Sequence, residues 1–354
     1  DDTATVRHIL TDILEDEPGI QVVGSAGDGE QAIQRLRHLT VDVLILDVEM
    51  PGMSGLEVLR HVHRDQPELP VLIFSSLTEK GAAVTIEALT LGAAGYVTKP
   101  SMTGSPDAAR KCIRSNLVTR IQAVTRSGAP REQDPRSVGA PGLNLPLPAG
   151  RRGPSRVDAV VIGVSMGGPQ ALTELFTALP TDLPVPVLIV QHMPPLFISA
   201  LAQRLSASGG LPVTECSQAV PVHPGGAWMA AGGYHMELER QEGGIVARPT
   251  LGEPVNFCRP SVDVLFHTAT ALFGEHVLGV VMTGMGHDGL DGARAIHDAG
   301  GQVLVQCRES SVVWGMGGSV VEAGLADGEV SLDQLGEEIG RRVRRERDWW
   351  EAGA

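Results

Sequence analysis

The sequence predicts an α/β protein built from two doubly wound domains, each with a parallel sheet. Three observations indicate this fold class. The chain has 354 residues, which is too long for one ordinary hydrophobic core. Short apolar runs alternate with helical patterns in both halves, as in parallel sheets with crossover helices. A Gly- and Pro-rich stretch, residues 127–154, separates the halves and predicts a linker.

The first half, residues 1–126, predicts buried parallel strands and helices in alternation. Continuous apolar runs predict strands over 41–47, 70–76 and 94–100. Apolar residues spaced at i, i+3 and i+4 predict helices over 28–39, 54–65, 79–92 and 106–126. Strands that are apolar on both sides need helices on both faces of the sheet.

The second half, residues 155–346, repeats this pattern and is followed by a tail over 347–354. Apolar runs predict strands over 158–164, 185–192, 276–284 and 301–307. Periodic segments predict helices over 169–179, 261–273 and 289–300, and a charged amphipathic helix with an arginine-rich solvated face from residue 335. Residues 227–240 and 243–249 predict a small antiparallel insertion between the parallel strands.

The composition argues against several classes of function. The net charge of −14 and the pI near 5.2 argue against a nucleic-acid partner, because binding a phosphate backbone needs a basic face. The four cysteines lie far apart, which predicts reduced thiols rather than disulfides or a zinc site. The opening residues do not resemble a leader, and no apolar stretch approaches 18 residues, so we expect a cytoplasmic protein without membrane insertion.

Polar residues follow the predicted strands of the first half at one edge of its sheet. Asp47, Ser75 and Lys99 each come directly after an apolar run, and Asp1 and Asp2 open the chain. Taken singly, each is more simply a turn residue or a surface charge. Together, the carboxylates predict a Mg²⁺ site beside a nucleophilic aspartate, with Ser75 and Lys99 placed to bind an added phosphoryl group.

The motifs "DVEMPGMSGLEVL", "FSSLTEKG" and "YVTKP", with the acidic pair upstream, resemble the receiver domain of two-component response regulators. The resemblance covers residues 1–126 and implies a flavodoxin-like fold. It implies phosphorylation of Asp47, switch roles for Ser75, Tyr96 and Lys99, and Mg²⁺ held by Asp1, Asp2, Asp47 and the Glu49 backbone carbonyl. This family begins with an apolar strand before the acidic pair, whereas this sequence starts at the pair, so we expect a sheet without that strand.

In the second half, residues 163–167 read Gly-Val-Ser-Met-Gly and match G-x-S-x-G, a strand-to-helix turn that exposes a serine hydroxyl. Glycine is common in this chain, so the match alone is weak. Ser165 is either a nucleophile or the N-cap of the following helix.

A base and an orienting acid are available at other strand ends. His192 ends one predicted strand, and Asp288 lies in the glycine-rich loop after another. An imidazole can take the serine proton while a carboxylate fixes its tautomer. The backbone N–H groups of Met285 and Met166 are the expected oxyanion donors.

His223, His235 and His287 compete for the role of base, and His192 is preferred because it directly ends a parallel strand. The chain order Ser, His, Asp also differs from the Ser, Asp, His order of α/β-hydrolases, which excludes an ordinary lipase or esterase fold.

The motifs "IGVSMGGPQAL", "QHMP", "FCRPSVDVLF" and "TGMGHDGLDGARAI" together resemble the catalytic domain of the CheB family of chemotaxis protein-glutamate methylesterases, over residues 156–345. The resemblance implies a Rossmann-like domain that hydrolyses glutamate methyl esters on methyl-accepting chemoreceptors and deamidates receptor glutamines, without a cofactor in the esterase site. It implies Ser165 as nucleophile, His192 as base and then acid, and Asp288 as its orienting group. Phosphorylation by a chemotaxis histidine kinase would relieve inhibition by the receiver.

The loop over 310–320 departs from this family, which usually has a proline and a basic residue where this chain has Gly317 and Gly318. Two alternatives to a hydrolase belong to other function classes. A catalytically silent docking module would be unaffected by Ser165→Ala, and a DNA-binding output is improbable because no basic helix-turn-helix follows the linker.

Overall fold

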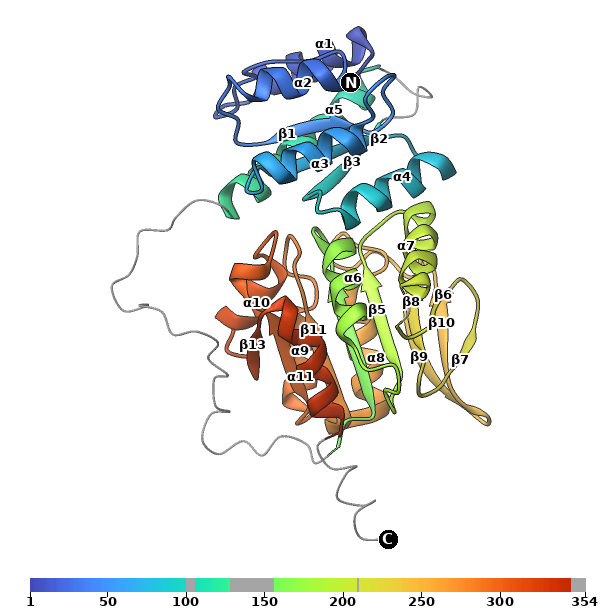
Figure 1. Ribbon diagram of the computed structural model, residues 1–354. Helices are drawn as coiled ribbons and strands as arrows, with labels where there is room; N and C mark the ends of the chain where they lie inside the picture. The colour runs from blue at the N-terminus through green and yellow to red at the C-terminus, as the bar shows by residue number, and fades with distance from the viewer. Residues whose placement is uncertain (100–105, 128–155, 209, 345–354) are drawn as a thin grey trace, which may run out of the picture. The chain divides into compact units, whose positions relative to one another are not determined.

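The computed structural model describes residues 1–99, 106–127, 156–208 and 210–344. The chain divides into two compact units, Asp1–Glu132 and Gln133–Ala354 (Figure 1). The predicted linker, apart from Ser127, and the predicted tail lie outside the described residues. None of the described helices combines the length and the apolar character that crossing a bilayer requires.

Unit 1 is a three-layer α/β arrangement, in agreement with the predicted fold class. Its parallel sheet has the strand order β1-β2-β3. Helix α1 packs on α5 on one side of the sheet, and α2 packs on α3 on the other (Figure 1). The elements are α1 (Ala4–Glu15), α2 (Gly29–Leu36), β1 (Leu44–Asp47), α3 (Gly55–Asp65), β2 (Val71–Ser75), α4 (Glu79–Thr90), β3 (Gly95–Thr98) and α5 (Pro106–Ser127).

Side-chain caps mark where α2, α3 and α4 of unit 1 begin. The Ser54 hydroxyl accepts from the Glu57 amide, and the Glu57 carboxylate accepts from the Ser54 amide, which forms a capping box at α3. The Asp28 and Thr78 side chains cap α2 and α4 by accepting from the amides of Gln31 and Gly81, without a capping box. These caps fix the loops that follow β1 and β2.

The outer edge of β1 borders a cavity of about 1070 Å³. Leu44 and Leu46 of β1, Leu10 of α1 and Ile121 of α5 contribute to its apolar lining. Within the described part of unit 1 no strand pairs with this edge, and residues 20–26 run along the cavity outside any helix or strand.

Unit 2 contains a seven-stranded sheet of order β13-β12-β11-β4-β5-β8-β6, with all neighbours parallel, and a separate antiparallel sheet of order β7-β10-β9. Its strands are β4 (Ala159–Val164), β5 (Val187–Gln191), β6 (Val213–Cys216), β7 (Val220–Val222), β8 (Ala227–Ala230), β9 (His235–Gln241), β10 (Gly244–Thr250), β11 (Val277–Val281), β12 (Gln302–Gln306) and β13 (Gly328–Val330). Its helices are α6 (Gly168–Ala178), α7 (Pro195–Ala207), α8 (Val262–Phe273), η1 (Gly274–His276), α9 (Leu290–Asp298), η2 (Arg308–Ser310), α10 (Met316–Glu322) and α11 (Leu332–Arg344).

In the sheet of unit 2, the direction in which the chain adds successive strands reverses between β4 and β11. From β4 the chain proceeds through β5 toward β6, whereas β11, β12 and β13 follow one another on the other side. Helix α11 packs on α6, and α8 packs on α9, so helices cover both faces of the sheet (Figure 1). The carboxyl ends at such a switch point form a crevice in which ligands bind.

Two expectations for unit 2 are wrong in part. Residues 227–230 were expected in the antiparallel insertion, but they form β8 of the large parallel sheet, because Ala227–Ala230 is buried along its whole length. The arginine run of α11 is not wholly solvated. The side chain of Arg342 is 11% exposed and donates to Gln302 Oε1 and Glu338 Oε1, both at 2.7 Å.

Candidate active site

Ser165 lies immediately after β4, in a tight turn that leads into α6. Its amide donates to the Thr283 carbonyl at 3.0 Å, and its carbonyl accepts from Gln191 Nε2 at 2.8 Å. These two bonds tie the turn to the strands on either side of β4. The N-cap of α6 is Gly167, with φ of 80°, and not Ser165. The alternative interpretation of Ser165 as a helix cap is therefore wrong.

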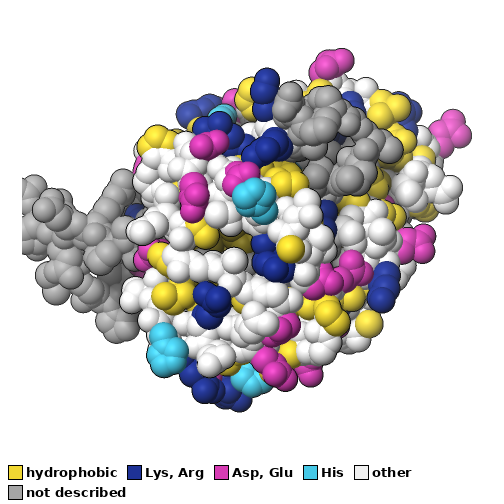
Figure 2. Space-filling view, turned by 90° about the horizontal axis from the view of Figure 1, so that it is seen from above, with side chains coloured by type: hydrophobic (Ala, Val, Ile, Leu, Met, Phe, Trp, Pro, Cys, Tyr) yellow, Lys and Arg dark blue, Asp and Glu magenta, His cyan; other side chains and the backbone are white. Residues whose placement is uncertain are grey.

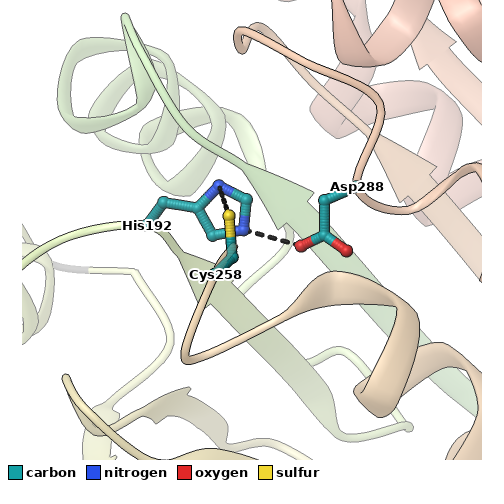
Figure 3. A group of neighbouring side chains, drawn as sticks. All are labelled: His192, Cys258 and Asp288. Carbon is teal, nitrogen blue, oxygen red and sulfur yellow. Dashed lines mark hydrogen bonds and ion pairs between the residues drawn. The ribbon is translucent and has the colours of Figure 1, made fainter. Parts of the chain in front are cut away.

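His192 and Asp288 come together at the same edge of the sheet as Ser165 (Figure 3). His192 follows β5, and its amide donates to the Val164 carbonyl of β4 at 3.2 Å. Its Nε2 lies 2.8 Å from Asp288 Oδ2, in the loop after β11. Because a carboxylate only accepts, Nε2 carries the proton and Nδ1 is the basic nitrogen of the neutral ring.

The Asp288 carboxylate is buried and held by the chain segment that begins α8. Besides His192 it accepts from four donors of this segment: Asn256 Nδ2 (3.0 Å), Ser261 Oγ (2.7 Å), the Val262 amide (2.7 Å) and the Asp263 amide (3.3 Å). Burial raises the pKa of Asp288, but its hydrogen bonds, above all that from His192, outweigh burial and hold the pKa well below its usual range. Asp288 is therefore a fixed negative charge.

The same contact changes the basicity of His192. Burial lowers the pKa of the imidazole, but the hydrogen bonds to Asp288 and to Cys258 outweigh it and raise the pKa to about 9. His192 is accordingly a stronger base than a free imidazole, and Asp288 stabilises its imidazolium form.

The competing histidines face other groups. His235 is buried, and its Nε2 lies 2.9 Å from the Glu253 carbonyl while its Nδ1 accepts from the Ser261 amide at 3.2 Å. His223 packs edge-on against Trp228, and His287 is exposed. Of these histidines, only His192 contacts Asp288.

The expected oxyanion donors lie on the two loops beside Ser165. Thr283 Oγ1 donates to the Met166 carbonyl at 2.9 Å, which joins these loops. A Cβ on Gly284 would lie 2.9 Å from Ser165 Cβ, so only glycine permits this approach. Within the described residues, neither the Met166 nor the Met285 amide donates to a protein acceptor. Both are available to a ligand.

Cys258 is a residue of the site that sequence reasoning missed. Its Sγ lies 3.8 Å from His192 Nδ1, and the sulfur, a His192 nitrogen and an Asp288 oxygen all lie within 4.8 Å of one another (Figure 3). It closes a tight turn with Val255 whose central residues, Asn256 and Phe257, have φ of 51° and 61°. Such a short turn lacks periodicity, and the asparagine was its one sequence signal.

Gly317 and Gly318 lie in the first turn of α10 and make room for the Trp314 indole. A Cβ on Gly317 would lie 2.8 Å from Val305 Cγ1 and 2.9 Å from Trp314 Cζ3, and one on Gly318 would lie 2.9 Å from Trp314 Nε1. The two glycines therefore fit the packing of a tryptophan beside the Gly284 loop, with which Trp314 forms a β-bridge.

We expect Gly317→Ala to lower the free energy of unfolding by about 1–3 kcal/mol, because the added methyl group overpacks a closed contact. The gain in helix propensity, about 1 kcal/mol, is the opposing effect. Gly243→Ala, in the β9–β10 turn with open space around its Cβ, is the matched control. Denaturant unfolding of both variants tests this, and equal midpoints would contradict it.

In unit 1 the predicted acidic residues gather at the carboxyl end of β1. Carboxylate oxygens of Asp1, Asp2 and Asp47 lie within 4.8 Å of one another. Lys99 Nζ lies 2.6 Å from Asp47 Oδ2 and 3.2 Å from Asp1 Oδ2, and the Glu49 amide donates to Asp47 Oδ1 at 3.0 Å. Asp1 Oδ2 is buried and, among the described residues, has the ion pair with Lys99 but no hydrogen bond, so this oxygen-rich set fits a hard cation such as Mg²⁺.

Ser75 and Tyr96 lie on the neighbouring strands β2 and β3. The Ser75 hydroxyl accepts a 2.6 Å hydrogen bond from the buried Thr85 hydroxyl of α4. The Tyr96 ring lies 5.8 Å from the Arg120 guanidinium of α5, and burial raises the pKa of its phenol. The two side chains thus connect the end of the sheet to α4 and α5.

The face shown in Figure 2 carries Asp and Glu side chains interspersed with Lys and Arg side chains. It does not present the continuous basic surface that binding to a phosphate backbone requires.

The comparisons with known proteins show which families the two halves of the chain resemble. The sequence model of the CheB methylesterase family matches residues 160–339, and that of the response regulator receiver domain matches residues 1–106. The chain belongs to the CheB methylesterase family. Its fold class is confirmed by the crystal structure of the Thermotoga maritima CheB methylesterase catalytic domain, which is 36% identical and covers 52% of this chain and 98% of its own, with a TM-score of 0.51.

Two curated relatives match along nearly the whole chain. Proteins from Trichodesmium erythraeum and Caulobacter vibrioides are each 43% identical, over 349 and 350 residues respectively, and the match covers 97% of both chains in each case. They are named protein-glutamate methylesterase/protein-glutamine glutaminase, the second with the suffix 2. The expected family, with a receiver domain and a methylesterase domain, is confirmed.

Proposed function

We propose that this protein is a phosphorylation-activated hydrolase that removes methyl groups from glutamate methyl esters on methyl-accepting chemoreceptors and deamidates receptor glutamines. The observation that carries the proposal is the 2.8 Å contact between His192 and Asp288 at the switch point of the sheet, where the turn of half-buried Ser165 also lies. A serine, an imidazole and a buried carboxylate suffice for acyl transfer.

In the proposed reaction the Ser165 hydroxyl attacks the ester carbonyl while His192 Nδ1 takes its proton. The Met166 and Met285 amides stabilise the oxyanion. The imidazolium, held by Asp288, then gives its proton to the leaving methoxide, which departs as methanol. Water, deprotonated by the same nitrogen, then attacks the acyl-enzyme. The bond to Ser165 Oγ breaks, the imidazolium returns the proton to Oγ, and the glutamate carboxylate is released.

The resting site is not yet aligned for this proton transfer. Within the described residues the Ser165 hydroxyl makes no hydrogen bond, and His192 Nδ1 faces Cys258. Catalytic hydrogen bonds in free enzymes are often long and tighten when substrate binds. We therefore assign the Ser165–His192 hydrogen bond to the substrate complex.

An amide substrate reacts through the same chemical steps. A receptor glutamine gives the same acyl-enzyme as the ester, with ammonia leaving in place of methanol after it takes the proton from His192. Both activities then depend on the same three side chains, and the leaving group alone distinguishes them.

The receiver provides control by accepting a phosphoryl group on Asp47. Asp1, Asp2, Asp47 and the Glu49 carbonyl would hold Mg²⁺, which offsets negative charge during phosphoryl transfer from a histidine kinase of the chemotaxis type. Lys99, which contacts Asp47, would pair with the phosphoryl oxygens, and Ser75 would donate to them. The added charge redirects Ser75 and Tyr96, and we propose that this relieves inhibition of the esterase site.

Asp47→Asn is expected to abolish phosphorylation and the accompanying activation, because an amide is not a phosphoacceptor. The measurement is methanol release from methylated receptor, with and without a small-molecule phosphodonor and Mg²⁺. Asp65→Asn, on the exposed end of α3, is the control and should respond like the parent chain. Stimulation of Asp47→Asn by the phosphodonor would contradict the role of this aspartate.

A further inference from the structure

A thiol and an imidazole nitrogen face one another in the esterase site, and the thiol has no role in the proposed reaction. Cys258 Sγ lies 3.8 Å from His192 Nδ1. Thiolate together with imidazole is the donor combination that Zn²⁺ prefers. Two zinc bonds at a tetrahedral angle, one to sulfur and one to nitrogen, separate the donors by roughly 3.6 Å. The observed separation needs little adjustment.

Asp288 completes the pattern as an outer partner. A histidine that binds a metal through one nitrogen usually donates its other N–H to a carboxylate. His192 Nε2 does this to Asp288 Oδ2 at 2.8 Å, which leaves Nδ1 as the free donor atom. The Asp288 carboxylate already accepts from four groups of segment 256–263, so it orients the ring and does not itself bind the ion.

The thiol is held in place by a rigid turn. The backbones of Val255 and Cys258 exchange hydrogen bonds of 3.1 and 2.8 Å. Asn256 Nδ2 donates to Asp288 at 3.0 Å and to Asp263 at 2.7 Å, which fixes a turn whose next residue, Phe257, is a non-glycine at φ of 61°. Backbone strain of this kind, about 1–3 kcal/mol, persists where surrounding contacts enforce it.

We propose that Cys258 and His192 form an inhibitory binding site for Zn²⁺ within the esterase centre. On binding, the thiol loses its proton to solvent, and Zn²⁺ bonds to Sγ and to Nδ1, with water in its remaining positions. The nitrogen that accepts the Ser165 proton is then occupied, so hydrolysis stops. Binding itself follows from the Cys258–His192–Asp288 geometry, whereas the inhibition rests on the proposed function.

The test uses the full chain with Mg²⁺ in excess, which saturates the acidic site of unit 1. Co²⁺ is titrated as a spectroscopic substitute for Zn²⁺, and a thiolate-to-cobalt charge-transfer band reports a Co–S bond. We expect this band in the parent chain, in Cys216→Ser and in Cys307→Ser, and its loss in Cys258→Ser and Cys258→Ala. No band in the parent, or a band that survives both Cys258 replacements, would overturn the proposal.

Inhibition is measured in parallel as methanol release against added Zn²⁺, with each variant referred to its own untreated rate. Cys258→Ala should raise the half-inhibiting Zn²⁺ concentration at least about tenfold. Equal sensitivity of Cys258→Ala and the parent would overturn the inhibitory role. Ser165→Ala separates this proposal from the proposed function, because it should keep the cobalt band whether or not it retains hydrolysis. Thermal unfolding of both Cys258 variants confirms that they are folded.

Discussion

Ser165→Ala is expected to lower methanol release from methylated receptor by at least about 10³-fold. The alanine removes the only hydroxyl that the turn after β4 presents to the crevice, so no acyl-enzyme forms. The loss should appear in kcat rather than in KM, because the side chain that is removed acts on the reacting carbonyl and not in binding the receptor.

The replacement should leave the fold intact. Ser165 is held through its backbone amide and carbonyl, and within the described residues its hydroxyl makes no hydrogen bond. The free energy of unfolding should therefore change by less than about 0.5 kcal/mol. Ser208→Ala, at the exposed end of α7, is the control for loss of a serine hydroxyl. Equal methanol release by Ser165→Ala and the parent would favour a catalytically silent docking module.

Asp288→Asn is the second large effect that we expect, a loss of about 10³–10⁴-fold in kcat. The carboxylate accepts from His192 Nε2 and from four donors of segment 256–263. An amide offers one accepting oxygen, and its NH₂ group would face donors. His192 would then lose the partner that keeps its proton on Nε2, and Nδ1 would no longer be available as base.

This variant should also be less stable, by about 1–3 kcal/mol, because buried donors lose their acceptor. Activity is therefore compared at a temperature at which unfolding measurements show the variant to be fully folded. Asp291→Asn, three residues further on with an exposed side chain that contacts His267, is the control and should retain activity. A folded Asp288→Asn with near-parental kcat would contradict the orienting role of Asp288.

Much of the fold could be predicted from the sequence because its strands are continuous apolar runs. The strands over 159–164 and 277–281 are buried along their whole length, so no alternation obscures them. β8 was assigned to the wrong sheet, because four apolar residues followed by Ala-Gly-Gly resemble either an edge strand or a core strand. Which sheet they join depends on pairing with β5 and β6. The pattern of four apolar residues does not indicate these partners.

The candidate site was predictable to the extent that its residues follow parallel strands, Ser165 and His192 directly and Asp288 in the loop after β11. Ser165 and His192 end neighbouring strands, and Asp288 follows the third, so sheet topology alone brings them to one edge. The second contact of His192, with Cys258, comes from an isolated turn before α8 that carries no periodic signal. Its spacing from His192 along the chain gives no indication of proximity.

Labelling with a fluorophosphonate, which phosphonylates activated serine hydroxyls, tests the central claim most directly. We predict one adduct on the full chain, located on Ser165 by peptide mass spectrometry, and its loss when His192 is replaced by alanine. An adduct at another residue, or undiminished labelling of Ser165 in His192→Ala, would contradict a hydroxyl activated by this imidazole.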